Sequence, residues 1–276
     1  MQDNQSFWIY WKFWNSQIFQ SIQNIQNHKK NMPFSRLELL IGENDLAKLR
    51  DAHVLLLGVG GVGSWVAETL ARTAVGHITL VDCDTVKPSN INRQVHALHS
   101  TIGRLKVEVM AERIRDINPD VDVTPLNLHL TPENITELLD GTPWSCVIDA
   151  IDERKPKFAA ILHCIRHGIP ILSSMGSANK TNPATVEITD ISETYGCPLA
   201  KLMRKALHKE GIQKGLKVCF SPELPSVLQN GGYHADEAEN PGERKPLGTI
   251  SYLPALFGLR LAAEAISMIR KGHAPA

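Results

Sequence analysis

Residues 53–84 read HVLLLGVGGVGSWVAETLARTAVGHITLVDCD, and this stretch decides the fold. Residues 54–57 form a short apolar run without a helical period, which is typical of a parallel strand buried on both faces. A glycine-rich loop follows, then a helix over residues 64–73 and a second strand over residues 77–81. The order strand, glycine loop, helix, strand and carboxylate predicts a nucleotide-binding βαβ unit rather than a purely structural turn.

The loop has the pattern G-x-G-G-x-G, and the second strand ends in Asp82. Glycines let the backbone approach a phosphate closely, and the N-terminus of the following helix directs free N–H groups at the anion. A carboxylate at the tip of the second strand is placed to accept hydrogen bonds from a ribose. We therefore predict that a nucleotide's phosphates and ribose bind at Gly58, Gly60, Gly61, Gly63 and Asp82.

Composition excludes several classes of site. The 276 residues include 29 basic and 29 acidic side chains, so attraction to nucleic acid requires a local basic patch rather than net charge. The five cysteines are scattered without a Cys-x-x-Cys pair. This pattern argues against a structural zinc site and a disulfide framework, and fits a reduced cytoplasm.

Residues 1–31 differ from the rest of the chain, because an aromatic cluster is followed by a Gln/Asn-rich tract. The cluster is too short and too polar to span a bilayer, and no cleavage site follows a basic start. An interfacial amphipathic segment is one interpretation. We favour a disordered or untranslated extension over residues 1–31, with folded protein beginning at Met32.

The middle of the chain repeats strand and helix units. We expect strands near residues 121–128, 145–150, 169–174 and 185–191, and helices over residues 103–117, 132–140 and 158–167. This alternation predicts an α/β fold with a doubly wound, mostly parallel Rossmann-like sheet. Ligands of such sheets bind at the carboxyl ends of the strands. We assign residues 32–195 to this nucleotide-binding core.

Residues 196–276 form a C-terminal helical and basic extension of the same domain. Residues 197–217 carry six lysines and arginines against one acid, which fits either a solvated helix face or a phosphate-backbone contact surface. Residues 222–246 have the composition of a mobile loop. Residues 250–269 predict an apolar helix interrupted by Arg260 and Glu264, hence a packing or subunit-contact helix rather than a membrane span.

A dehydrogenase would use the same glycine loop, so the choice of nucleotide depends on other residues. Arg93 and Lys106 are cations near strand ends, and they suit a triphosphate whose α-phosphorus accepts a nucleophile. Asp152 follows another strand, where its carboxylate can hold Mg²⁺ against those phosphates. Together, these residues favour adenylyl transfer over hydride transfer.

Four segments resemble the E1-like superfamily, which includes ThiF and MoeB: GVGGVG at 58–63, LVDCDTVKPSNINRQ at 80–94, GRLK at 103–106 and IDAIDE at 148–153. The resemblance implies an adenylation domain in which Asp82 binds the ATP ribose and Asp152 binds Mg²⁺. Arg93 and Lys106 would contact the phosphates, with Asp84 and Asn92 in the same ATP-binding set. Arg36 matches an arginine that this family inserts into the neighbouring subunit, which implies a homodimer with Arg36 acting in trans.

A narrower resemblance runs from about residue 34 to residue 271. Phrases such as RLELLIGENDLAKL, VIDAIDERKPK, CPLAKLMRKAL and GTISYLPALFG resemble the TcdA branch of the superfamily, the tRNA threonylcarbamoyladenosine dehydratases. This branch implies a tRNA substrate carrying N6-threonylcarbamoyladenosine, which is cyclised after ATP activates its carboxylate. The basic segment suggests phosphate contacts by Lys201, Arg204, Lys205 and Lys209. A monovalent cation and a cysteine desulfurase with its sulfur acceptor are further partners left open.

Two rival functions stay open at this point. One is a MoeB- or ThiF-like adenylyltransferase that activates the C-terminal glycine of a ubiquitin-like sulfur carrier. That branch normally carries two zinc-binding Cys-x-x-Cys pairs, which this chain lacks. The other is a non-catalytic scaffold, against which the intact acidic and basic set argues.

Cys219 lies near the place where E1-like enzymes present a thiol, although a buried, unreactive cysteine is the favoured interpretation.

Overall fold

The structure is a computed structural model that describes residues 33–225 and 247–272. The extension expected over residues 1–31 and most of the loop expected over residues 222–246 lie outside this range. The chain divides into two compact units, residues 1–47 and 48–276, each of which is described by itself. The domain boundary expected after residue 195 stays a prediction.

The described part of the first unit is helical. Helix α2 (Ser35–Ile41) is followed by α3 (Glu43–Arg50), which extends past the boundary between the units. Gly42 separates the two helices with a φ of 83°, a conformation that glycine adopts without steric cost.

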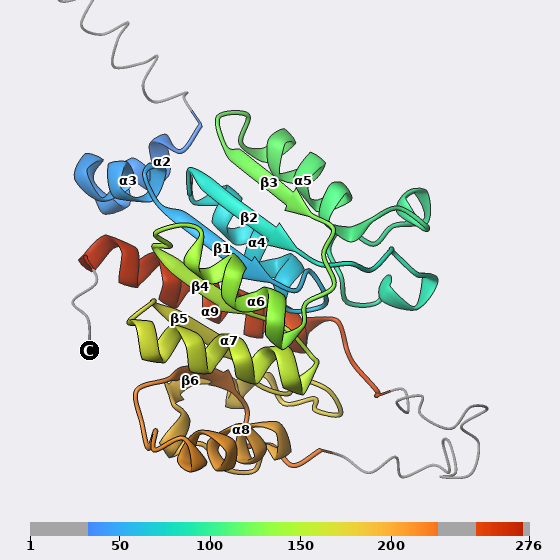
Figure 1. The fold of residues 1–276 in the computed structure, drawn as a ribbon. Coiled ribbons are helices and arrows are strands. Elements are labelled where there is room, and N and C mark those ends of the chain that lie inside the picture. Colours follow the sequence, from blue (N-terminus) through green and yellow to red (C-terminus); the bar gives the residue numbers. More distant parts are fainter. Residues whose placement is uncertain (1–32, 226–246, 273–276) are drawn as a thin grey trace, which may run out of the picture. The chain divides into compact units, whose positions relative to one another are not determined.

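The second unit is built on a seven-stranded sheet with the order β3-β2-β1-β4-β5-β7-β6 (Figure 1). Every neighbouring pair is parallel except β6 and β7, which run antiparallel. The predicted fold class, a mostly parallel Rossmann-like sheet, is confirmed. The strands are β1 (His53–Leu57), β2 (His77–Val81), β3 (Asp122–Leu126), β4 (Cys146–Asp149), β5 (Ile171–Ser174), β6 (Glu187–Asp190) and β7 (Lys217–Phe220).

Helices cover both faces of the sheet (Figure 1). Helix α4 (Gly63–Arg72) contacts α5 (Lys106–Ile117) and α9 (Tyr252–Lys271), and all three helices contact strands on one face. Helices α6 (Pro132–Asp140), α7 (Arg154–His167) and α8 (Pro198–Lys209) cover the other. The sequence places the start of α7 too late, because its first turn is charged and contains Pro156, which that position tolerates.

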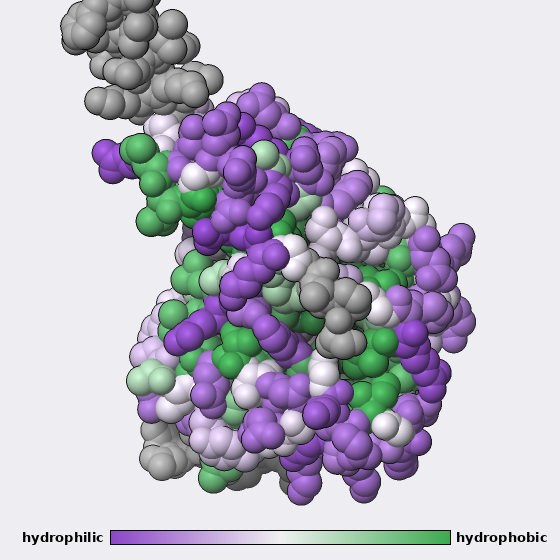
Figure 2. Space-filling model, turned by 90° about the vertical axis from the view of Figure 1, so that its left-hand side faces the viewer, coloured by the Kyte–Doolittle hydropathy of each residue, from purple (hydrophilic) through white to green (hydrophobic). Residues whose placement is uncertain are grey.

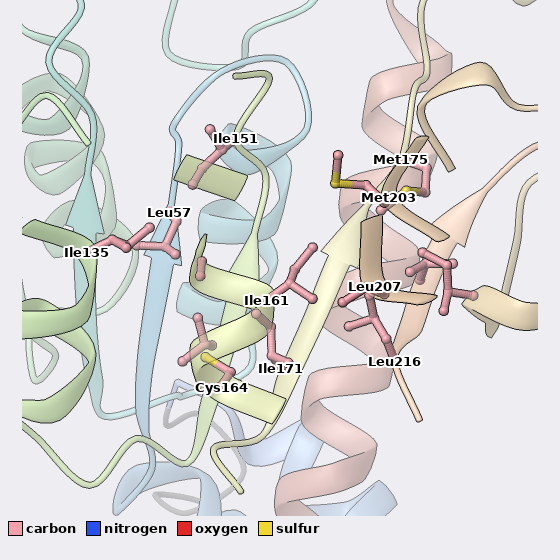
Figure 3. Close-up of a cluster of buried hydrophobic side chains, with 14 of the residues drawn as sticks. Leu57, Ile135, Ile151, Ile161, Cys164, Ile171, Met175, Met203, Leu207 and Leu216 are labelled. Carbon is pink, nitrogen blue, oxygen red and sulfur yellow. The ribbon is translucent and has the colours of Figure 1, made fainter. Parts of the chain in front are cut away.

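The core beneath α6, α7 and α8 is continuous (Figure 3). Leu57, Val147 and Val218 come from three different strands, and they pack against Ile161 of α7 and Leu207 of α8. All five side chains are at most 1% exposed. Their burial fixes the strands in register and so fixes where the carboxyl ends of those strands meet.

Helix α9 is long and apolar enough to cross a membrane by length and composition alone. Within the described unit it packs against α4 and the sheet instead. A Cβ at Gly258 would lie 2.6 Å from the Val62 carbonyl oxygen and 2.7 Å from the Trp65 Cβ, so the two helices touch closely there. On the face drawn in Figure 2, hydrophobic residues form separate patches between hydrophilic ones. Helix α9 is therefore the packing helix that the sequence predicts over residues 250–269.

Candidate nucleotide-binding site

The glycine loop forms a tight turn between β1 and α4. Gly58 has a φ of 90°, and its N–H donates to the Val81 carbonyl at 2.8 Å. A Cβ at Gly63 would lie 1.9 Å from the Gly58 carbonyl oxygen, so only glycine fits there. A Cβ at Gly60 would meet nothing within 4 Å, which leaves that part of the loop open to a ligand.

Asp82 is fixed directly beside this loop. Its Oδ2 accepts the Val59 N–H at 2.7 Å, and its Oδ1 accepts the Asp84 N–H at 2.9 Å. Two backbone donors hold the carboxylate in one orientation, while each oxygen keeps a lone pair for a further donor. The position at the end of β2 and the fixed geometry both suit an acceptor for ribose hydroxyl groups.

Lys106 reaches the same region from the first residue of α5. Lys106 is only 5% exposed, and its Nζ donates to Asp84 Oδ2 at 2.7 Å. The backbone joins the same two residues, because the Lys106 N–H donates to the Asp84 carbonyl at 3.0 Å. The sequence predicts Asp84 and Lys106 as separate ATP contacts, whereas the structure brings them together as a pair.

The Arg93 side chain packs against the glycine loop. A Cβ built on Gly61 would be 3.3 Å from the Arg93 Cδ, so the side chain crosses the loop in van der Waals contact. Its Nη1 donates to the Ser89 carbonyl at 2.8 Å and to Asn92 Oδ1 at 3.1 Å. Burial lowers the pKa of the guanidinium, which nevertheless stays protonated at neutral pH. A fixed positive charge therefore lies at the glycine loop.

Asp149 is the last residue of β4 and Asp152 follows the strand, and the two carboxylates have different surroundings. Asp152 is exposed just before α7 begins. Asp149 is fully buried, and its Oδ2 accepts from Lys157 Nζ at 2.6 Å and from Ser173 Oγ at 2.6 Å. The sequence marks Asp149 only as the end of a strand. Nothing in the spacing to Lys157 distinguishes this buried pair from the exposed charges around it.

The donor set fits a magnesium ion that is shared with phosphates. The described residues contain no group of three or more His, Cys, Asp or Glu side chains that could hold a metal alone. Mg²⁺ commonly binds through one or two carboxylates together with substrate phosphates and water. Asp152 presents one exposed carboxylate and follows β4, the neighbour of the strand that leads into the glycine loop. It therefore fits that requirement.

Two buried side chains near this site have unpaired polar atoms. Gln94 Oε1 and both ring nitrogens of His96 have no hydrogen-bond partner, although the two residues are 5% and 1% exposed. Burial, with the nearby charges of Lys106 and Arg113, lowers the pKa of His96 to about 4. The imidazole is therefore neutral at physiological pH, a feature that the sequence does not reveal.

The remaining residues named from the sequence come from other elements. Arg36 is exposed on α2 in the first unit. Lys201, Lys205 and Lys209 are exposed on α8, while Arg204 Nη1 donates to the Thr194 carbonyl at 2.7 Å. Arg204 thus also ties α8 to the preceding turn. Cys219 is fully buried in β7, and burial raises its pKa, as expected of an unreactive thiol.

The sequence matches a known family model and named relatives. Residues 34–276 match the ThiF family model. A tRNA threonylcarbamoyladenosine dehydratase of Bacillus subtilis is 43% identical over 86% of this chain and 94% of its own length. One from Escherichia coli is 45% identical over 82% of this chain and 89% of its own length.

A solved structure extends the similarity to the fold. The crystal structure of E. coli TcdA in complex with ATP superposes with a TM-score of 0.76 and is 36% identical. The match covers 87% of this chain and 94% of that chain. The chain belongs to the ThiF family.

Proposed function

We propose that the protein is an ATP-dependent dehydratase that cyclises N6-threonylcarbamoyladenosine in tRNA. The observation that carries this proposal is that Asp82 and Arg93 both contact one glycine loop, while Lys106 pairs with Asp84, two residues after Asp82. Relatives that match nearly the whole chain are named for this activity, and one of them was crystallised with ATP. The combination favours this function over activation of a sulfur-carrier protein.

ATP would bind across the loop between β1 and α4. Gly60 leaves space for the phosphates, and Asp82 accepts hydrogen bonds from the ribose. Arg93 and Lys106 neutralise charge that develops on the phosphate oxygens. Asp84 holds Lys106 in place until the phosphates arrive, and Asn92 supports the Arg93 guanidinium.

Asp152 would hold Mg²⁺ against the same phosphates. When bound, the ion withdraws charge from the phosphate oxygens and so assists attack at the α-phosphorus. The role of the protein is to present one exposed carboxylate there, just before α7. Replacing Asp152 with Ala should abolish turnover, and unchanged ATP consumption would contradict the assignment.

The chemistry balances without a thiol intermediate. The threonyl carboxylate attacks the α-phosphorus, the bond to the β,γ-phosphates breaks, and pyrophosphate leaves. The adenine N6, which bears the carbamoyl group, then attacks the acyl-adenylate carbonyl, loses its proton and closes a five-membered ring. AMP departs with one former carboxylate oxygen, so the base loses the elements of water. Since ring closure is intramolecular, proximity lowers its barrier.

Lysines of α8 would contact the tRNA backbone. Lys201, Lys205 and Lys209 are exposed on this helix, and Arg204 can contribute while it anchors the helix. Replacing the three lysines with Glu should weaken tRNA binding and reduce its salt dependence. The matched control is Lys271→Glu, which changes another exposed lysine at the end of α9.

Arg36 would complete the ATP site of a second copy of the chain. The test is complementation: Arg36→Ala and Asp152→Ala variants should each be inactive, and mixing them should restore part of the activity. The control mixture combines Asp152→Ala with Lys106→Ala, which cannot form an intact site. Equal activity of the two mixtures would exclude a site completed in trans.

The function is tested directly by incubating the protein with ATP, Mg²⁺ and tRNA that carries threonylcarbamoyladenosine. A nucleoside lighter by one water, formed only with ATP, is expected after mild digestion. Unchanged tRNA, together with ATP–pyrophosphate exchange that needs a glycine-tailed protein, would indicate the sulfur-carrier function. A tRNA substrate places the enzyme in the cytoplasm. A monovalent cation and a cysteine desulfurase stay predictions.

A further inference from the structure

A pocket of about 670 Å³ has in its wall Arg93, the residue that packs against the glycine loop. Its walls come from the 88–93 loop, from His99 and from Leu247 and Thr249. The volume lies within the range of about 300–1,000 Å³ that is usual for small-molecule sites. The pocket is thus large enough for a nucleoside.

Arg93 separates this pocket from the loop. The residue lines the pocket, and its aliphatic carbons rest against Gly61. Asp82, which is expected to bind the ATP ribose, contacts the loop at Val59 and does not line the pocket. The pocket therefore adjoins the phosphate end of the ATP site, where the attacking group must enter.

The walls combine apolar side chains with fixed polar groups. Pro88, Ile91 and Leu247 supply the apolar part. The polar rim is held in place, because Asn92 Nδ2 donates to the Thr249 carbonyl at 3.2 Å and its Oδ1 accepts from Arg93. Such a wall suits a planar ring with polar edges, which is how proteins bind a base that has left its stack.

We propose that this pocket receives the modified adenine base of the tRNA, with its threonylcarbamoyl group directed at Arg93. The proposal rests on the proposed function and adds the place where the substrate binds. The Arg93 guanidinium can pair with the threonyl carboxylate at the pocket wall. That pairing brings the nucleophile beside the phosphate loop, as adenylation requires.

The test fills the pocket. Ile91 is 36% exposed and lines it, whereas Ile102 is 39% exposed and does not, so Ile91→Trp and Ile102→Trp form a matched pair. Ile91→Trp should lower kcat/KM for the modified tRNA about tenfold or more, while the dissociation constant for ATP stays within about twofold. Ile102→Trp should leave both unchanged. Leu247→Trp, at a second wall, should behave like Ile91→Trp.

A second measurement isolates recognition of the base. Wild-type protein should bind modified tRNA more tightly than the same tRNA with plain adenosine, and Ile91→Trp should abolish that difference. If wild-type protein converts the modified tRNA while both wall variants retain full kcat/KM, the pocket assignment fails and the function stands. A weakened affinity for ATP in both wall variants would assign the pocket to the triphosphate instead. If wild-type protein does not convert the tRNA, the proposed function itself fails.

Discussion

Two lysine–carboxylate pairs lie at the carboxyl ends of β2 and β4, and they differ in exposure rather than in the distance between the charged atoms. Lys157 Nζ is 2.6 Å from Asp149 Oδ2, and both side chains are 0% exposed. Lys106 Nζ is 2.7 Å from Asp84 Oδ2, and the side chains are 7% and 56% exposed. We call them the sealed pair and the open pair. Distance alone would give them the same role.

Their surroundings separate them. In the sealed pair, Asp149 also accepts from Ser173 Oγ and from the Ile151 N–H, so protein groups occupy its oxygens. In the open pair, Asp84 faces solvent and a phosphate can replace it as the partner of Lys106. The comparison teaches that a sealed charge serves the fold, whereas an open one can serve a ligand.

The largest expected effect comes from breaking the sealed pair. Lys157→Met leaves a buried, unpaired Asp149 and should lower the free energy of unfolding by about 3–5 kcal/mol. Urea denaturation measures this change. The double variant Asp149→Leu with Lys157→Met should recover much of the loss, because no unpaired charge remains. A single-variant loss below about 1 kcal/mol would mean that the pair is not sealed in solution.

The open pair should respond in the opposite way. In the proposed mechanism Lys106 stabilises charge in the transition state, so Lys106→Met should lower ATP-dependent turnover about 10²–10³-fold. The free energy of unfolding should change by no more than about 1 kcal/mol, since Asp84 stays solvated. Steady-state kinetics and urea denaturation on the same preparation check both. Large losses of stability with little loss of turnover would reverse the assignment of the two pairs.

His96 lies near Lys106 of the open pair but is buried, so it tests the effect of burial on a group beside that pair. Its pKa falls from 6.5 to about 4 in the folded protein, so acid protonates the unfolded chain first. Stability from this group is complete above about pH 6.5 and falls as the pH drops towards 4, with a loss of about 2 kcal/mol between pH 7 and pH 5. Denaturation at both pH values should show a smaller difference in His96→Gln than in wild-type protein. Equal differences would show that His96 is not buried.

The sequence predicts the glycine loop and Asp82 far better than it predicts the sealed pair. Glycines at 58–63 and the acid at 82 must appear in a fixed order, because the backbone has to turn and present N–H groups to a phosphate. The sealed pair has no such constraint, since Lys157 reads as one more charge at the start of a helix. Strand β7 is missed for a related reason: its four residues begin with Lys217 and follow a basic segment that masks them.

The same limit applies to residues whose roles depend on partners far away in the sequence. The pairing of Asp84 with Lys106 spans 22 positions, and the support of Asn92 by Thr249 spans 157. No local period records such contacts, because tertiary packing alone creates them. Helix α6 is the opposite case: Thr131 accepts the Asn134 N–H and caps it at the predicted residue, because capping is a local interaction.

The smallest expected effect tests what Asp84 does in the open pair. Asp84→Asn removes the charge but keeps a hydrogen-bond acceptor near Lys106, so the free energy of unfolding should change by less than about 1 kcal/mol. If Asp84 only positions Lys106, ATP should bind a few-fold more weakly, because the lysine is less well oriented, and turnover should fall far less than in Lys106→Met. Adding Asp84→Asn to Lys106→Met should then change nothing further, since residues that act through one another are not additive. An independent further loss in the double variant would show that Asp84 contacts ATP directly.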